Sequence, residues 1–116
     1  MHELAATQSI LEAVLHHIQG VKPGRAITLC LALGEMSEMT EESVRFYWEE
    51  ISRGTAAQGA CLNFRHVPVE LLCLNCNQRY APVGDEVACP ACGGDKLNVA
   101  AGEEFYLEAI EIETQT

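Results

Sequence analysis

Hydrophobic positions recur at three- and four-residue intervals in two stretches of the chain, and this spacing predicts two amphipathic helices. The first stretch covers residues 4–19 and ends before Pro23, which does not continue a helix. The second begins after Thr40, whose hydroxyl can cap the first turn, and ends at Gly54. Its three aromatic side chains are expected to pack in a core and not to form a binding patch: Phe46, Tyr47 and Trp48.

Three other stretches alternate between large apolar side chains and small or polar ones, which predicts β-strands over residues 26–33, 60–67 and 105–113. In the first of them the large side chains occupy every second position, and this face is expected to lie under the helices: Ile27, Leu29, Leu31 and Leu33. In the last strand the apolar parity changes near Ala109, and this change predicts either a β-bulge or a strand that changes which face it buries.

The order of these elements is helix, strand, helix, strand, a cysteine-rich stretch and a final strand. The final strand has no other core to join, so we expect it to return to the sheet made by the first two strands. The predicted fold is therefore α+β, with a small sheet of about three strands, two helices and an inserted four-cysteine zinc-ribbon module. We expect the α+β domain to comprise residues 1–70 with 103–116, and the module to comprise residues 71–102.

Four of the six cysteines form two C-x2-C pairs with twelve residues between them. The pairs are Cys73 with Cys76 and Cys89 with Cys92. This spacing is typical of a tetrahedral thiolate site. A residue that tolerates the left-handed backbone region follows each pair, Asn77 in one and Gly93 in the other. We expect a structural Zn2+ held by all four cysteines, although a four-thiolate site can also hold iron.

A catalytic zinc is not expected, because four cysteine ligands leave no open position for water. The sequence also lacks a phosphate-binding loop and a nucleophile motif, so we do not expect an enzyme. The remaining two cysteines, Cys30 and Cys61, lie in strand-like runs, and we expect both to be buried as small hydrophobic side chains.

The chain of 116 residues is acidic, with 7 basic and 17 acidic side chains and a formal charge of −10. Zn2+ bound to four thiolates makes the charge about two units more negative. Because such a chain is repelled by phosphate backbones, no nucleic-acid partner is expected. We expect no membrane association either, because no apolar run is long enough to span a bilayer. No signal peptide is visible, and free thiolates suit a reducing cytoplasm.

The first three residues, Met1-His2-Glu3, offer a possible chelate. The α-amine, the amide nitrogen of residue 2 and the imidazole of His2 can surround one ion, and Glu3 can complete the set. Nitrogen-rich ligand sets of this kind select Ni(II) or Cu(II). The other histidines are not expected to bind metal, since His16 and His17 diverge on a helix end and His66 has no second ligand nearby.

The combination of Met1-His2-Glu3-Leu4, the Cys-x2-Cys pair, the Cys-Pro-x-Cys-Gly pair and a closing acidic strand resembles the HypA/HybF family of nickel metallochaperones. The resemblance implies a protein that delivers Ni2+ during maturation of [NiFe]-hydrogenase, with urease as a further candidate target. It implies a HypB-type GTPase and the hydrogenase large subunit as partners.

The resemblance also implies a role for each candidate site residue. The Met1 amine and His2 become nickel ligands, and Glu3 becomes a ligand or a carboxylate beside the ion. The four cysteines of the two pairs become ligands of a structural Zn2+. No histidine flanks either pair, so the sequence offers no local residue for ligand exchange at zinc.

Two other functions remain compatible with the four cysteines. One is a zinc-ribbon module that binds protein or nucleic acid without a nickel role, although the seven basic residues are scattered and form no stripe. The other is electron transfer through a rubredoxin-like iron site. For the oligomeric state we expect a monomer or a weak homodimer.

Overall fold

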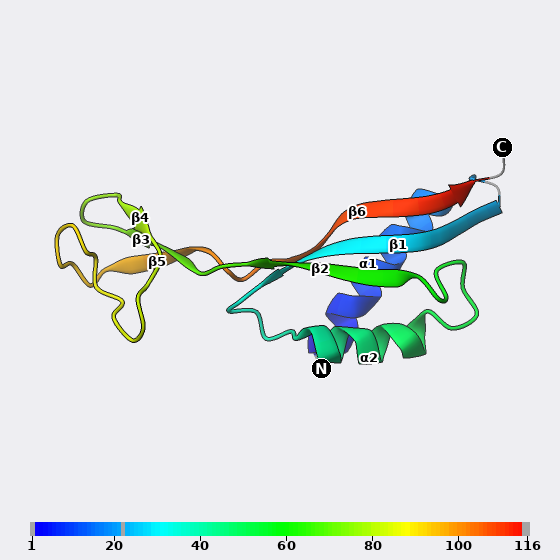
Figure 1. The fold of residues 1–116 in the computed structure, drawn as a ribbon, viewed down its shortest axis with the longest axis horizontal. Helices are drawn as coiled ribbons and strands as arrows, with labels where there is room; N and C mark the ends of the chain where they lie inside the picture. Colours follow the sequence, from blue (N-terminus) through cyan, green and yellow to red (C-terminus); the bar gives the residue numbers. More distant parts are fainter. Residues whose placement is uncertain (1, 22, 115–116) are drawn as a thin grey trace.

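Two three-stranded sheets lie toward opposite ends of an elongated molecule with principal extents of 57 × 30 × 18 Å (Figure 1). The computed structural model describes residues 2–21 and 23–114, without the side chains of His2, Pro23 and Thr114. Among these residues, neither helix has the length and apolar character needed to cross a membrane.

The first sheet joins strands that are far apart in the sequence, in the order β2-β1-β6. Its strands are β1 (Pro23–Gly34), β2 (Cys61–Val67) and β6 (Phe105–Thr114). β1 pairs parallel with β2 and antiparallel with β6. A parallel pair needs a crossover connection, which helix α2 (Glu41–Ile51) provides. The predicted return of the last strand to the sheet of the first two is confirmed.

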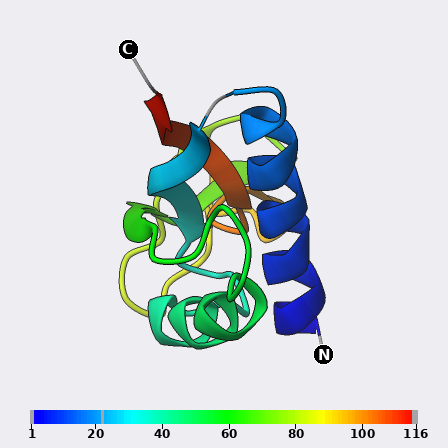
Figure 2. The ribbon, with the colours of Figure 1, turned by 90° about the vertical axis from the view of Figure 1, so that its right-hand side faces the viewer.

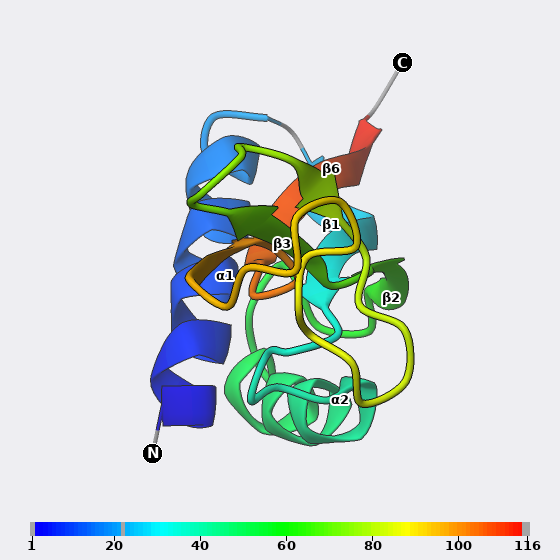
Figure 3. The ribbon, with the colours of Figure 1, turned by 90° about the vertical axis from the view of Figure 1, so that its left-hand side faces the viewer.

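Helices α1 (His2–Ile18) and α2 both cover one face of the first sheet, as the end-on views show (Figures 2 and 3). The core between the helices and the sheet includes Val14 from α1, Val44 and Trp48 from α2, and Leu29 and Leu31 from β1. All five are at most 4% exposed. No helix of the described residues lies on the opposite face of the sheet (Figure 2). The predicted α+β class, with two helices on a small sheet, is confirmed.

The predicted alternation of β1 holds for most of the strand but fails at its beginning. Leu29, Leu31 and Leu33 lie in the core, whereas Ile27 is 39% exposed and Ala26 only 2%. The pairing of β1 with β6 shifts register between Ala26 and Thr28. This irregularity reverses which residues face the helices, and the prediction that Ile27 is buried is therefore wrong.

The bulge predicted near Ala109 is confirmed. Cys30 pairs with Ala109, and the next residue of β1, Leu31, pairs with Leu107. Glu108 is thus the extra residue in β6. Because of this one-residue slip, Leu107 and Ile110 both pack against the core although their sequence numbers differ in parity.

Two further expectations about burial are wrong. Cys61 is exposed and Cys30 is only half-buried, because both lie on the sheet face that the helices leave open. On α2, Trp48 is buried as predicted, but Phe46 is 61% exposed and contacts Tyr47 edge to face. The α2 helix is short, and its apolar stripe is too narrow to bury all three aromatic rings.

The second sheet was not predicted from the sequence. It contains β3 (Glu70–Cys73), β4 (Arg79–Tyr80) and β5 (Leu97–Ala101) in the order β4-β3-β5. All neighbouring strands in it are antiparallel. We refer to residues 70–101 as the cysteine module. Its buried hydrophobic residues are Leu71, Cys73 and Cys89.

The two connections between the sheets meet at the end of β1. The backbone N–H of Gly34 donates to the carbonyl of Glu104, and the N–H of Met36 donates to the carbonyl of Gly102, both at 2.7 Å. A Cβ on Gly34 would lie 2.1 Å from the Gly102 carbonyl oxygen. Gly102 itself has φ +115°, which side chains rarely adopt. This junction of Gly34 and Gly102 therefore requires glycine at both positions.

Candidate metal centre

The structure brings the sulfurs of the two C-x2-C pairs together in one cluster. Cys73, Cys76, Cys89 and Cys92 each offer one Sγ, and all four atoms lie within 4.8 Å of one another. The Sγ atoms of Cys73 and Cys92 are 3.5 Å apart, and those of Cys76 and Cys89 are 3.6 Å apart. Sulfurs bound to one tetrahedral zinc at about 2.3 Å lie about 3.8 Å from each other. The spacing of these sulfurs therefore fits a four-coordinate metal site.

Each cysteine pair lies on a tight turn that positions its sulfurs. After the first pair, Asn77 has φ 64° and donates its N–H to the carbonyl of Cys73 at 2.8 Å. After the second, Gly93 has φ 71° and donates in the same way to the carbonyl of Cys89, also at 2.8 Å. The left-handed residue predicted after each pair is thus present. In each turn the second cysteine is exposed and the first is buried.

The environment of the thiols differs within the cluster. Backbone N–H groups, first that of Cys76, lower the pKa of Cys73 to about 7 despite burial. The backbone N–H of Gly94 lowers the pKa of Cys92, but the Cys73 sulfur, burial and the other two sulfurs together raise it to about 12. Four thiols this close cannot all ionise by themselves, because each thiolate raises the pKa of the next. A divalent cation supplies the missing positive charge, and thiolates favour a soft metal such as zinc.

Residues outside the two pairs also shape the centre, and sequence analysis did not single them out. The Tyr80 hydroxyl donates to the carbonyl of Val87 and so ties β4 to the loop before Cys89. Burial and the four nearby sulfurs raise the pKa of Tyr80, so this hydroxyl stays protonated as a donor. A Cβ on Gly94 would lie 2.4 Å from Asn75 Nδ2 and 3.2 Å from Cys92 Sγ, so a larger residue here would displace the Asn75 side chain and crowd the Cys92 sulfur.

The predicted nickel ligands lie mostly outside the described residues. Met1 is not described, and His2 is described only as the first backbone residue of α1. Glu3 is half-buried in the first turn of α1 and lines a surface hollow of about 330 Å3. The same hollow is lined by residues from the start of α2, which the sequence did not connect with Glu3: Thr40, Glu42, Ser43, Phe46 and Tyr47. The beginnings of both helices therefore lie side by side.

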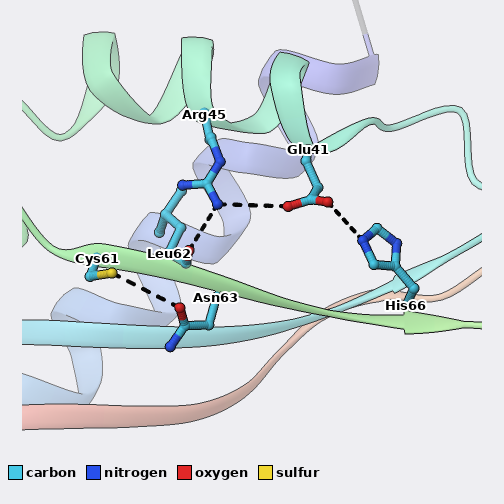
Figure 4. A network of polar contacts seen from close by, with 6 residues as sticks. All are labelled: Glu41, Arg45, Cys61, Leu62, Asn63 and His66. Atoms are coloured by element: carbon cyan, nitrogen blue, oxygen red, sulfur yellow. Dashed lines mark hydrogen bonds and ion pairs between the residues drawn. The ribbon is translucent and has the colours of Figure 1, made fainter.

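The histidines expected not to bind metal have other surroundings. His16 and His17 are exposed in the last turn of α1. His66 Nε2 lies 2.8 Å from Glu41 Oε2, and Glu41 also pairs with Arg45 at 3.6 Å (Figure 4). Arg45 in turn donates to the carbonyl of Leu62. This network of His66, Glu41, Arg45 and Leu62 attaches α2 to β2 at the surface.

One protein-family model matches residues 1–112 of the chain, and its description reads hydrogenase/urease nickel incorporation, metallochaperone, hypA. The hydrogenase maturation factor HypA of Dehalococcoides mccartyi is 31% identical over 116 residues, which cover 100% of this chain and 98% of that relative. The matched range thus spans the first three residues, both helices and all four cysteines of the centre.

Two solved structures are similar over nearly the whole chain. The solution structure of a HypA protein has a TM-score of 0.80 at 21% identity and covers 99% of this chain and 98% of its own. The solution structure of the Ni metallochaperone HypA from Helicobacter pylori has a TM-score of 0.74 at 20% identity, with 97% and 98% covered. At these identities the likeness supports the fold alone.

Proposed function

Because the chain belongs to the HypA family of hydrogenase and urease nickel-incorporation metallochaperones, we propose that it binds Ni(II) at residues 1–3 and delivers it to a nickel enzyme. The observation that carries this proposal is the family match over residues 1–112, a range that spans residues 1–3 and the four clustered cysteines. The target is expected to be [NiFe]-hydrogenase, with urease as a second nickel enzyme that the same delivery would serve.

The chemistry of the first residues supports a nickel site. The Met1 amine, the amide nitrogen of His2 and its imidazole form fused chelate rings around one ion, and Glu3 adds a carboxylate. Glu3 and Glu42 line the same hollow, and two carboxylates there favour a cation nearby. A chaperone must also release its ion, and ligand exchange at a site made by the first residues of the chain would allow this.

For the four-cysteine site we propose a structural Zn2+. The sulfur spacing suits tetrahedral zinc, and all four coordination positions would be filled by Cys73, Cys76, Cys89 and Cys92. Zinc would then hold the cysteine module in shape and take no part in nickel transfer. On this proposal residues 1–70 with 103–116 form the nickel-binding domain and residues 71–102 the zinc-binding one.

A role in enzyme maturation requires contact with other maturation proteins. We propose a HypB-type GTPase and the hydrogenase large subunit as the two partners, and the cytoplasm as the compartment, where thiolates remain reduced. The formal charge of −10 favours partner surfaces that are basic.

Nickel titration of the zinc-loaded chain tests the proposal. His2→Ala should weaken nickel binding by about tenfold or more, because the loss of even a hydrogen-bond partner of a metal ligand typically lowers metal affinity by that factor. Residues added before Met1 should have a similar effect because they remove the free amine. The matched control is His17→Ala, which removes an exposed histidine at the other end of α1 and should leave the affinity unchanged. Equal nickel affinity in all four proteins would contradict the nickel site.

A further inference from the structure

The loop between the two cysteine pairs exposes apolar side chains at the end of the molecule far from the helices (Figure 1). Val83 is 77% exposed and Val87 is 54% exposed. With neighbouring loop residues they line a hollow of about 480 Å3 whose wall is mainly apolar: Ala81, Pro82, Ala88 and Pro90. Single exposed apolar side chains are normal on protein surfaces, but here they lie together around one hollow.

The hollow has a fixed shape. Val83 and Glu86 form an antiparallel bridge, and the Glu86 N–H donates to the Val83 carbonyl at 3.0 Å. On the other side the Tyr80 hydroxyl donates to the carbonyl of Val87. Cys89 is both a wall residue of the hollow and a member of the four-cysteine site. A metal bound at that site therefore also holds one wall of the hollow in place. A ligand that binds there loses little free energy to ordering the loop.

We propose that this hollow binds a short segment of a partner protein in which an apolar side chain is flanked by lysine or arginine. The valines and prolines accept the apolar side chain. Glu86 in the wall and Asp85 in the adjoining turn provide negative charge for the flanking cations. A divalent metal with four thiolates adds a net charge of −2 next to the wall, which strengthens the same preference.

The charges also argue against the other occupants of such a hollow. A second copy of this chain also carries a formal charge of −10, and the two copies repel each other. Nucleic acids and anionic lipid surfaces are disfavoured for the same reason. The shape of the hollow depends on the occupied four-cysteine site and not on nickel binding. Its lining residues belong to β4 and the loop that follows it, and not to the sheet that α1 covers.

Peptide titrations of the 15N-labelled, zinc-loaded full chain test this site by nuclear magnetic resonance. The probe is a capped six-residue peptide in which Leu-Val lies between two lysines. It is compared with a second peptide that has glutamates in place of the lysines, and with a third that has serines in place of Leu-Val. We expect the lysine peptide to shift the amide signals of residues 80–90 and to bind at least about tenfold more tightly than the glutamate peptide. The serine peptide should leave these signals unmoved.

The matched variants are Val83→Ser with Val87→Ser, and Val99→Ser as the control. Val99 is 38% exposed on β5 of the same module but does not line the hollow. The double variant should retain its zinc and its nickel affinity yet lose the peptide shifts, whereas the control should keep them. Unchanged nickel binding in the double variant separates the docking site from the nickel proposal.

Three results would overturn the docking site. One is the absence of shifts at residues 80–90 with the lysine peptide on the unaltered chain. Another is equal binding of all three peptides, which would remove the proposed recognition. The third is a concentration-dependent shift of the same signals without peptide, which would make a second copy the occupant.

Discussion

The two sheets have the same number of strands, but they are stabilised differently. The β2-β1-β6 sheet lies under two helices and contributes to a core of buried residues that includes Val14, Leu29 and Trp48. Within residues 2–21 and 23–114 no helix covers the β4-β3-β5 sheet, and Leu71 is the one buried leucine of the cysteine module. Burying one leucine contributes about 2 kcal/mol, whereas structural zinc contributes about 10 kcal/mol or more in zinc-finger peptides. Hydrophobic burial therefore stabilises the first sheet, and metal binding must stabilise the second.

Removal of the metal should have the largest effect, and it should destabilise the second sheet while the first sheet remains folded. A chelator, or Cys76→Ser, should remove the hydrogen-exchange protection of residues 70–101 while the amides of β1 stay protected, because the first sheet keeps its own core. Cys61→Ser is the control, since this exposed cysteine lies outside the metal site. Loss of protection in both sheets, or in neither, would contradict the separate origins of their stability.

The reverse experiment weakens the first sheet. Leu29→Ala should lower the free energy of unfolding by about 3 kcal/mol, because it leaves a cavity in the core. Trp48, the single tryptophan, reports this unfolding by fluorescence in a urea titration. Ile27→Ala, on the same strand but 39% exposed, should cost about 1 kcal/mol or less. Equal losses for the two variants would mean that the core does not run along β1 as described.

A smaller effect is expected at the start of α2. Thr40 accepts a hydrogen bond from the Ser43 N–H, and the Ser43 hydroxyl accepts one from the Thr40 N–H. Thr40→Ala should therefore destabilise the first sheet by about 1 kcal/mol. Thr40→Ser keeps the capping oxygen and should restore most of the loss, as measured by thermal unfolding. A loss in the serine variant as large as that in the alanine variant would assign the effect to the methyl group instead.

The smallest expected effect concerns pH. Hydrogen bonds from Arg65 across the open face of the first sheet hold the pKa of Glu108 below its ordinary value. Because the folded pKa is depressed, this pair stabilises the sheet above the unfolded pKa of about 4.3 and ceases to do so as pH falls through the folded value. Glu108→Gln should remove that part of the pH dependence. Glu111→Gln is the control, because Glu111 makes no ion pair with any residue that the structure describes.

Local patterns predicted the elements of the first sheet well because each element is long enough to show a period. The helical stripes, the capping Thr40 and the parity change that marks the bulge at Glu108 are all visible over ten residues or so. The exposed Ile27 could not be predicted in this way. Its orientation is determined by the register of β1 against β6, and those strands are far apart in the sequence.

In the cysteine module the grouping of the cysteines was predictable from the sequence, whereas the strands were not. The grouping of the four cysteines could be predicted because C-x2-C spacing is a local property of the chain. The strands of the module were not evident, because β4 has two residues and β3 four, too few to show alternation. The contact of the Tyr80 hydroxyl with Val87 depends on the loop conformation, and no sequence pattern indicates it.

The junction at Gly34 and Gly102 makes the module separable from the rest of the protein. The chain leaves the first sheet after Val67, which pairs with Gly34, and re-enters it at Phe105, which pairs with Leu33. Exit and entry thus lie on the two sides of β1, about 10 Å apart at two strand spacings. A linker of a few residues spans that gap without altering a pairing in the sheet. Evolution can therefore lengthen, replace or delete the cysteine module while the first sheet and its helices retain their architecture.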